Sequence, residues 1–263
     1  MSDFSRELAF KQDLFLGEIW SDRFFSLIQK KLDIKNAETV LHFNAGTGRN
    51  CFALAEHSRN TLQITGICET PQHFQIAQDK AAALKSPIRF QAEPVTDRTF
   101  DIVIADASLS RPEHLPTLLS QISAALRSDG TFFLIAAASG SFAEIFSLLW
   151  EVTAEDGGSN SGVIESLIAA LPKLDSLIDD AKNADLRKIE SEVATEIFEY
   201  ERADDFAQSP LFADFLLPQW LSDFSCDELA VIRKKISRLI EKEYGDLPFR
   251  FQVKAAVISG KRG

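Results

Sequence analysis

The chain has 263 residues, 45% of them hydrophobic, and a net charge of -11 from 39 acidic and 28 basic side chains. A chain of this length can bury a core as one large domain or as a domain with a cap. It has neither the roughly 18 consecutive apolar residues of a membrane helix nor the layout of a signal peptide. We therefore expect a cytoplasmic protein without membrane contact. The excess of acidic side chains argues against a duplex nucleic-acid partner, because phosphate binding depends on Lys and Arg. The three cysteines lie far apart and the four histidines are scattered, so we expect neither a disulfide framework nor a metal site.

Short β-forming runs alternate with helical patterns after an N-terminal helical segment, residues 1–38. The expected strands are residues 39–43, 62–68, 88–92, 100–106 and 130–138. Strands that alternate with helices are typical of βαβ units, which build a parallel sheet. We therefore expect an α/β fold.

Two of the intervening helices have recognisable ends. Thr70 and Pro71 predict a helix start, because a threonine hydroxyl caps the first turn and proline at the first helical position lacks only an N–H that has no helical partner there. Residues 112–130 place four leucines and an isoleucine on one helical face, and we expect this helix to end at Gly130.

The second half of the chain changes character. Helical patterns fill residues 141–187 on both sides of a loop at 155–162. Ser225 and Glu228 have the spacing of a capping box, in which each residue bonds the backbone N–H of the other. A further long helix is therefore expected to begin after Ser225.

Two more strand candidates and an acidic segment complete the pattern. Residues 191–201 have the pattern of a polar strand, and residues 249–258 alternate apolar and polar side chains as a half-buried strand does. Residues 151–205 contain 15 acidic and 5 basic side chains. Such a segment is either a solvated surface or a docking face for a basic protein partner.

Several stretches, in the right order, resemble the class I S-adenosylmethionine-dependent methyltransferases. The stretch VLHFNAGTGRN (40–50) is similar to the family turn VLDLGCGTGRN, and GICETP (66–71) is similar to GVDISP. The remaining similar stretches are FQAE (90–93), FDIVIAD (100–106) and LRSDGTFFLIA (126–136). The likeness covers about 100 residues, from Thr39 to Ala138, and resumes in the last strand.

The resemblance implies an α/β fold with a Rossmann-like, mostly parallel sheet of seven strands, helices on both faces, an antiparallel last strand and a helical insertion. Residues 191–201 and 249–258 would be the sixth and seventh strands. The implied parts are an N-terminal helical segment (1–38), an S-adenosylmethionine-binding core (39–140), a helical insertion or cap with one sheet strand near 191–201 (141–248), and a final strand that returns to the core sheet (249–263).

The glycine turn is the first candidate site. Small residues let the backbone approach a ligand, and the helix that begins near Gly48 points its free N–H groups at a carboxylate or phosphate. Gly46 and Gly48 keep this property, and Asn44 tolerates a positive φ. With Ala45 they would bind the methionine end of the cofactor. The other interpretation is a tight turn that only packs a helix on a strand.

Two cofactor-binding positions differ from the family pattern. The position of the acid that binds the ribose in the family is occupied by Cys68, and Glu69 follows one residue later. A thiol is a poor hydrogen-bond acceptor. Glu69 is either the ribose ligand or a solvated acid that leads the next helix. His42 replaces an acid in the first strand, where a neutral imidazole accepts a hydrogen bond from the cofactor's ammonium or is satisfied within the sheet.

Four residues lie at the adenine and acceptor sides. Glu93 takes the place of the family's adenine-side acid or is an ordinary loop carboxylate, and Ala92 leaves room for the adenine ring. Asp106 ends the fourth expected strand, at the strand ends where doubly wound sheets bind ligands. His114 is either a general base or an exposed helix histidine. The sequence identifies no catalytic residue.

The resemblance implies an S-adenosylmethionine-dependent methyltransferase with a small or lipophilic acceptor. The absence of an NPPY motif argues against nucleic-acid bases. Alternatives are a degenerate member that acts as a scaffold or regulatory partner, and a fold relative that binds another nucleoside-containing ligand. Aromatic side chains of the insertion form either an apolar wall for the acceptor or ordinary core: Phe142, Phe146, Trp150, Phe212, Phe215 and Trp220.

Overall fold

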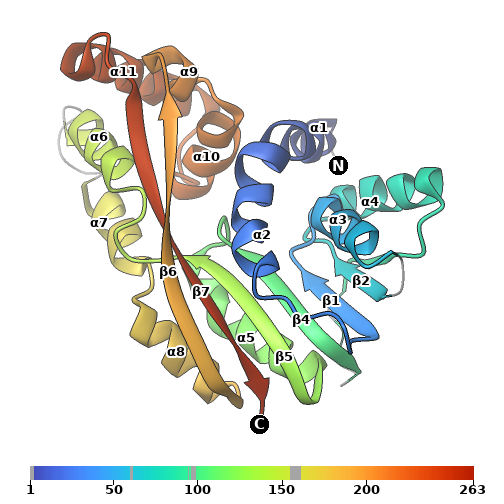
Figure 1. The fold of residues 1–263 in the computed structure, drawn as a ribbon. Coiled ribbons are helices and arrows are strands. Elements are labelled where there is room, and N and C mark those ends of the chain that lie inside the picture. Colours follow the sequence, from blue (N-terminus) through green and yellow to red (C-terminus); the bar gives the residue numbers. More distant parts are fainter. Residues whose placement is uncertain (1–2, 60–61, 94, 96–98, 155–160) are drawn as a thin grey trace. The chain divides into compact units, whose positions relative to one another are not determined.

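The computed structural model describes residues 3–59, 62–93, 95, 99–154 and 161–263 and contains a seven-stranded sheet (Figure 1). The strands are β1 (Thr39–Phe43), β2 (Gln63–Ile67), β3 (Arg89–Gln91), β4 (Phe100–Ala107), β5 (Leu126–Ala137), β6 (Leu186–Tyr200) and β7 (Phe249–Arg262). Their order is β3-β2-β1-β4-β5-β7-β6, and β7 runs opposite to its neighbours in Figure 1. The expected Rossmann-like fold with a reversed last strand is confirmed.

The first five strands are parallel, and β1 lies at their centre. Leu41 is in register with Thr65 of β2 on one side and with Val103 of β4 on the other. β2 also pairs with β3, and β4 pairs with β5, in the same direction. The carboxyl ends of these strands therefore meet at one edge of the sheet, which is where ligands bind in folds of this kind.

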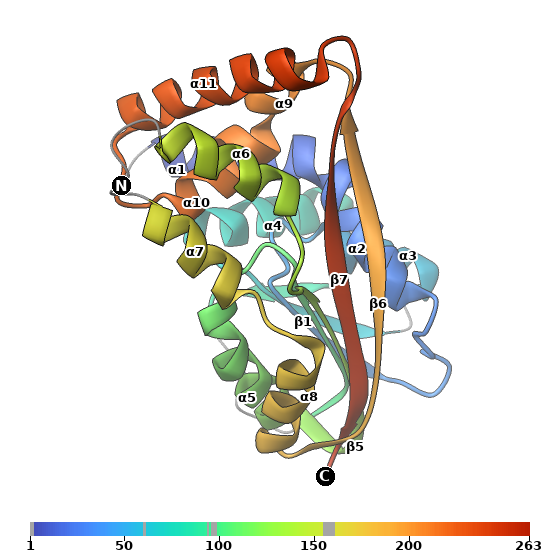
Figure 2. The ribbon, with the colours of Figure 1, turned by 90° about the vertical axis from the view of Figure 1, so that its left-hand side faces the viewer.

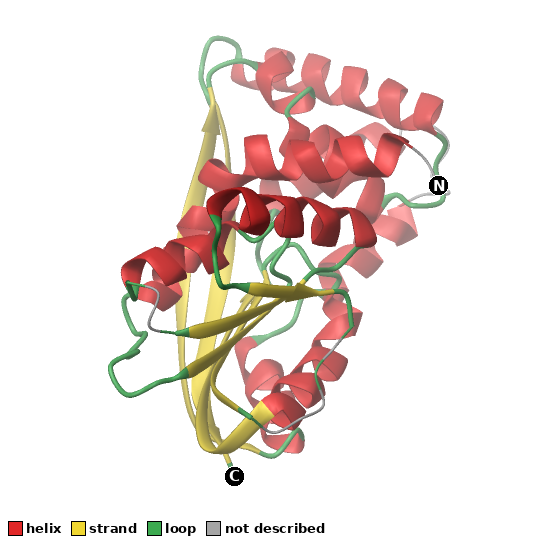
Figure 3. Ribbon diagram, turned by 90° about the vertical axis from the view of Figure 1, so that its right-hand side faces the viewer, coloured by secondary structure: helices red, strands yellow, loops and turns green. Residues whose placement is uncertain are grey.

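Two compact units divide the chain. The first comprises Met1–Ala136, Leu174–Ala194 and Ala256–Gly263, and the second comprises Ala137–Lys173 and Thr195–Ala255. The first contains the helical elements α1 (Asp3–Lys11), the π-helix η1 (Gln12–Ser21), α2 (Asp22–Gln29), α3 (Arg49–His57), α4 (Pro71–Leu84), the short η2 (Pro112–His114), α5 (Leu115–Ala125) and α8 (Leu174–Asn183). Figure 2 shows α5 and α8 on one face of the sheet and α2 and α3 on the other, and Figure 3 shows these layers from the opposite side.

The second unit is mainly helical. It contains α6 (Ala143–Ala154), α7 (Ser161–Ala170), α9 (Ala203–Ala207), η3 (Leu211–Leu216), α10 (Leu217–Trp220) and α11 (Cys226–Tyr244). Its core is a cluster of aromatic rings, in which the Phe206 ring centroid lies 4.6 Å from those of Phe212 and Phe249. Among the helices described, none is long and apolar enough to cross a membrane.

The local signals for helix starts are confirmed. Thr70 Oγ1 accepts a hydrogen bond from the N–H of His73 at 3.2 Å, and Pro71 begins α4. At the start of α11, Ser225 N donates to Glu228 Oε2 at 2.7 Å, and Glu228 N donates to Ser225 Oγ at 3.3 Å. Both caps satisfy N–H groups that have no partner inside the helix.

Two predicted helix ends are wrong, because strand pairing extends into the stretches that carry the helical pattern. The helix expected over residues 112–130 ends at Ala125, and Leu126 begins β5 in register with Phe100 of β4, next to a register shift. The helical pattern expected to reach residue 187 ends at Asn183, and β6 begins at Leu186. Residues 155–160 of the predicted loop lie outside the described residues.

Candidate cofactor site

The glycine turn joins β1 to α3 through three residues with positive φ. Asn44 has a φ of 53°, Gly46 of 54° and Gly48 of 88°. Gly48 is the residue before α3, and a Cβ added there would lie 2.5 Å from the ring of Phe90. A side chain at Gly48 is therefore disfavoured by both backbone conformation and space. The turn brings the first N–H groups of α3 to the edge of the sheet.

Glu69 lies against this turn. It follows β2, and its Oε2 accepts a hydrogen bond from the Gly46 N–H at 2.9 Å. One third of its side-chain surface (33%) is accessible, yet the surrounding protein displaces enough water for burial to raise the pKa of the carboxyl. An ionised carboxylate has about four lone-pair sites, so the bond to Gly46 leaves sites for a ligand.

Asp106 lies at the same edge, as the second-last residue of β4. Its backbone carbonyl accepts a hydrogen bond from Asn44 Nδ2 at 2.9 Å, which ties the glycine turn to β4. Its carboxylate accepts bonds from Ser108 Oγ at 2.6 Å and Ser108 N at 3.0 Å. Burial, together with the charge of Glu69, raises the pKa of Asp106. The edge therefore holds two carboxyl groups, an arrangement suited to a ligand that carries positive charge.

His42 is enclosed within the sheet. It is 1% exposed, and burial lowers its pKa to about 4. Its Nδ1 lies 2.9 Å from the carbonyl of Phe43, its Nε2 has no protein partner among the described residues, and the ring of Phe25 lies 6.0 Å away. The imidazole is therefore neutral at physiological pH, and its role at the methionine end of a cofactor stays a prediction.

The candidate residues that follow β2 and β3 differ in burial. Cys68 is buried at the end of β2, where burial raises the pKa of its thiol to about 12, and its N–H donates to the Gln91 carbonyl at 2.9 Å. Ala92 and Glu93 are exposed and follow β3 directly. Of the two residues considered for the ribose position, Glu69 is the one with a carboxylate at this edge, since Cys68 supplies a neutral thiol. The roles of Ala92 and Glu93 stay predictions.

Two candidate residues remain, Ala45 in the glycine turn and His114 in the loop after β4. Ala45 is buried, and its N–H donates to the Ile67 carbonyl at 2.8 Å, which holds the turn against β2. His114 is exposed at the end of η2, which agrees with its interpretation as an exposed helix histidine.

Sequence reasoning missed the contribution of η1. The carboxylate of Asp13 accepts hydrogen bonds from Thr47 in the glycine turn and from Lys80 of α4. Trp20 Nε1 donates to Ser108 Oγ at 2.8 Å, and Ser108 in turn binds Asp106. No local pattern reveals contacts between residues 34 or 88 positions apart. The helix η1 thus packs onto both the glycine turn and the loop after β4.

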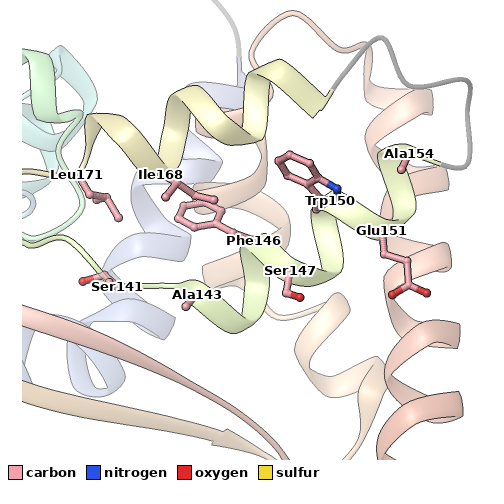
Figure 4. A pocket seen from close by; sticks show the side chains of 10 residues that line it. Ser141, Ala143, Phe146, Ser147, Trp150, Glu151, Ala154, Ile168 and Leu171 are labelled. Carbon is pink, nitrogen blue, oxygen red and sulfur yellow. The ribbon is translucent and has the colours of Figure 1, made fainter.

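The second unit contains a cavity of its own, about 880 Å³ in volume, formed by α6 and α7 (Figure 4). Of the six aromatic residues expected to form an apolar wall, Phe146 and Trp150 line this cavity. Phe142 and Phe212 are buried in the core, which is the other role considered for them. The Trp220 ring packs against Phe142, with centroids 5.1 Å apart.

A family model for a methyltransferase domain matches residues 34–191, more than half of the chain. The chain belongs to this methyltransferase family. The resemblance to class I S-adenosylmethionine-dependent methyltransferases is confirmed, and S-adenosylmethionine is the cofactor of that class. A comparison with curated proteins found no match.

Solved structures resemble the chain over nearly its whole length. The YcgJ protein of Bacillus subtilis has a TM-score of 0.58 and 14% identity, with 92% of this chain and 98% of that chain covered. Phosphoethanolamine N-methyltransferase 2 of Haemonchus contortus, solved with phosphomonomethylethanolamine and S-adenosylhomocysteine, has a TM-score of 0.57 and 15% identity, with 97% of this chain and 57% of that chain covered. At these identities the likeness shows the fold alone.

Proposed function

We propose that this protein binds S-adenosylmethionine at the edge formed by β1, β2 and β4 and transfers its methyl group to a small or lipophilic acceptor. The observation that carries the proposal is the placement of Glu69, whose Oε2 lies 2.9 Å from the N–H of Gly46. A carboxylate thus lies beside a backbone turn that admits close approach. The departure at Cys68 is offset by the next residue.

The residues present fit the cofactor. Glu69 is partly accessible and would accept hydrogen bonds from the two ribose hydroxyls. Gly46 and Gly48 leave room for the methionine end, and Asn44 holds their turn on β4 through its bond to the Asp106 carbonyl. Bound there, S-adenosylmethionine supplies a methyl group activated by a sulfonium sulfur. Its positive charge suits an edge that holds Glu69 and Asp106.

The acceptor side supports catalysis by alignment. Holding two reactants in line can lower a barrier by several kcal/mol without a dedicated acid or base. The chain of hydrogen bonds from Trp20 through Ser108 to Asp106 fixes the loop after β4, where the acceptor would approach. A lipophilic acceptor is supported by the aromatic composition, 21 Phe against 2 Tyr, which supplies few hydroxyl groups.

The test is calorimetric titration of S-adenosylmethionine and S-adenosylhomocysteine into the full-length protein and into Glu69→Ala. Loss of a charged hydrogen-bond acceptor costs about 1.5–3 kcal/mol, which corresponds to roughly 10- to 150-fold in affinity. We expect micromolar binding by the wild type and a loss of at least about tenfold in the variant. Glu56→Gln, on the exposed side of α3, is the matched control and should bind as the wild type does.

No binding at millimolar ligand by a folded wild-type protein would refute the proposal. It would favour the degenerate alternative, a scaffold that acts through the acidic segment 151–205. Binding without any effect of Glu69→Ala would refute the assigned role of Glu69 and leave the cofactor assignment intact.

A further inference from the structure

The cavity of the second unit is built from one face of α6. Its lining residues on this helix recur every three or four positions, so a single stripe faces the cavity: Ala143, Phe146, Ser147, Trp150, Glu151 and Ala154. The other wall comes from Ile168 of α7 and from Leu171, just beyond that helix. A hollow of about 880 Å³ lies within the range of small-molecule sites.

The walls are mainly apolar and partly open to solvent. Phe146 is buried at the base, whereas Trp150 is 38% and Ile168 47% exposed. Figure 4 shows Phe146, Trp150 and Ile168 between α6 and α7. Apolar side chains exposed around a hollow of this size are typical of a ligand site.

Two neighbouring side chains of α6 select the charge of the ligand. Glu151 is the only charged residue among those that line the cavity and are described. Next to it, the exposed indole of Trp150 offers the best aromatic face for a cation. A cationic group would be attracted by either side chain, whereas an anion would be repelled by Glu151 and a neutral group would use neither.

We propose that the cavity between α6 and α7 binds a ligand with an apolar body and a cationic amino group. The inference goes beyond the proposed function and does not rest on it. The binding itself does not involve S-adenosylmethionine. It is therefore measured with the protein alone.

The experiment compares three ligands with the same chain and different head groups, decylammonium, decanol and decanoate, below their micelle concentrations. Each is titrated calorimetrically into the full-length protein without cofactor. We expect decylammonium to bind several-fold more tightly than decanol and decanoate to bind most weakly. Equal affinity for all three, or no binding of decylammonium, would overturn the proposal.

Two variants locate the binding. Glu151→Gln should weaken decylammonium about threefold to tenfold and leave decanol unchanged, and Ala143→Trp should weaken all three because it fills the cavity. Glu165→Gln removes the same charge from an exposed position of α7 that does not line the cavity, and it should change nothing. An equal effect of Glu151→Gln and Glu165→Gln would mean that only the general charge matters, against the proposal.

Failure here is distinguishable from failure of the proposed function. If S-adenosylmethionine binds at the Glu69 edge and decylammonium does not bind, only the ligand class assigned to the α6–α7 cavity is refuted. If decylammonium binds in the α6–α7 cavity and S-adenosylmethionine does not, the methyltransferase proposal fails and the ligand site stands.

Discussion

The buried His42 should make the protein sensitive to mild acid. Its pKa is lowered from 6.5 to about 4 by burial, with a small opposing effect of its bond to the Phe43 carbonyl. Between these two values the unfolded chain binds a proton that the folded protein excludes, so stability is lost as the pH falls from about 6.5 to 4. At about 1.4 kcal/mol per pKa unit, the loss from His42 reaches roughly 2 kcal/mol near pH 5 and about 3 kcal/mol near pH 4.

Urea denaturation, followed by circular dichroism at a series of pH values, tests this. His42→Phe removes the titrating group, and between neutral pH and about pH 5 the variant should lose about 2 kcal/mol less stability than the wild type. His73 has a similarly lowered pKa but contributes to both proteins and cancels in the comparison. Phe25→Leu, which alters packing beside His42 without a titrating group, should keep the wild-type pH dependence. Identical pH dependence of His42→Phe and the wild type would refute the reasoning.

Two further substitutions test the frame of the site. Gly48→Ala should destabilise the protein by about 1–3 kcal/mol. The φ of 88° at this position is unfavourable for alanine, and the new Cβ would meet the ring of Phe90. A thermal melt within 1 °C of the wild type would contradict this. Asp101→Asn should cost about 1.5–3 kcal/mol in urea denaturation at neutral pH. The carboxylate accepts bonds from the backbone N–H groups of Glu38 and Thr39, at the start of β1, and pairs with Arg127 at 2.6 Å. Unchanged stability would mean that the carboxylate is replaceable there.

Local signals in the sequence were sufficient for the types of most elements and for the backbone of the glycine turn. The bounds of β1 agree with expectation because a short apolar run stops at residues that favour a turn. The N-caps Thr70 and Ser225 could be predicted because their bonds join residues three positions apart. The glycine turn is equally local, since the positive φ at Gly46 and Gly48 is a property of the residue type.

Tertiary structure decided what depends on distant partners. Leu126 begins a strand because β4 offers a pairing edge, against a helical pattern that continues through it. The hydrogen bond from the Gly46 N–H to Glu69 likewise joins residues of two different strand ends, whereas the ribose-binding role of Glu69 stays a prediction.

The covering of the site by η1, through Asp13 and Trp20, depends on contacts between residues far apart in the chain. The sequence by itself determined the residue types and the short-range hydrogen bonds. Only the folded chain decided burial and long-range pairing, because these arise when segments remote in sequence exclude water from one another.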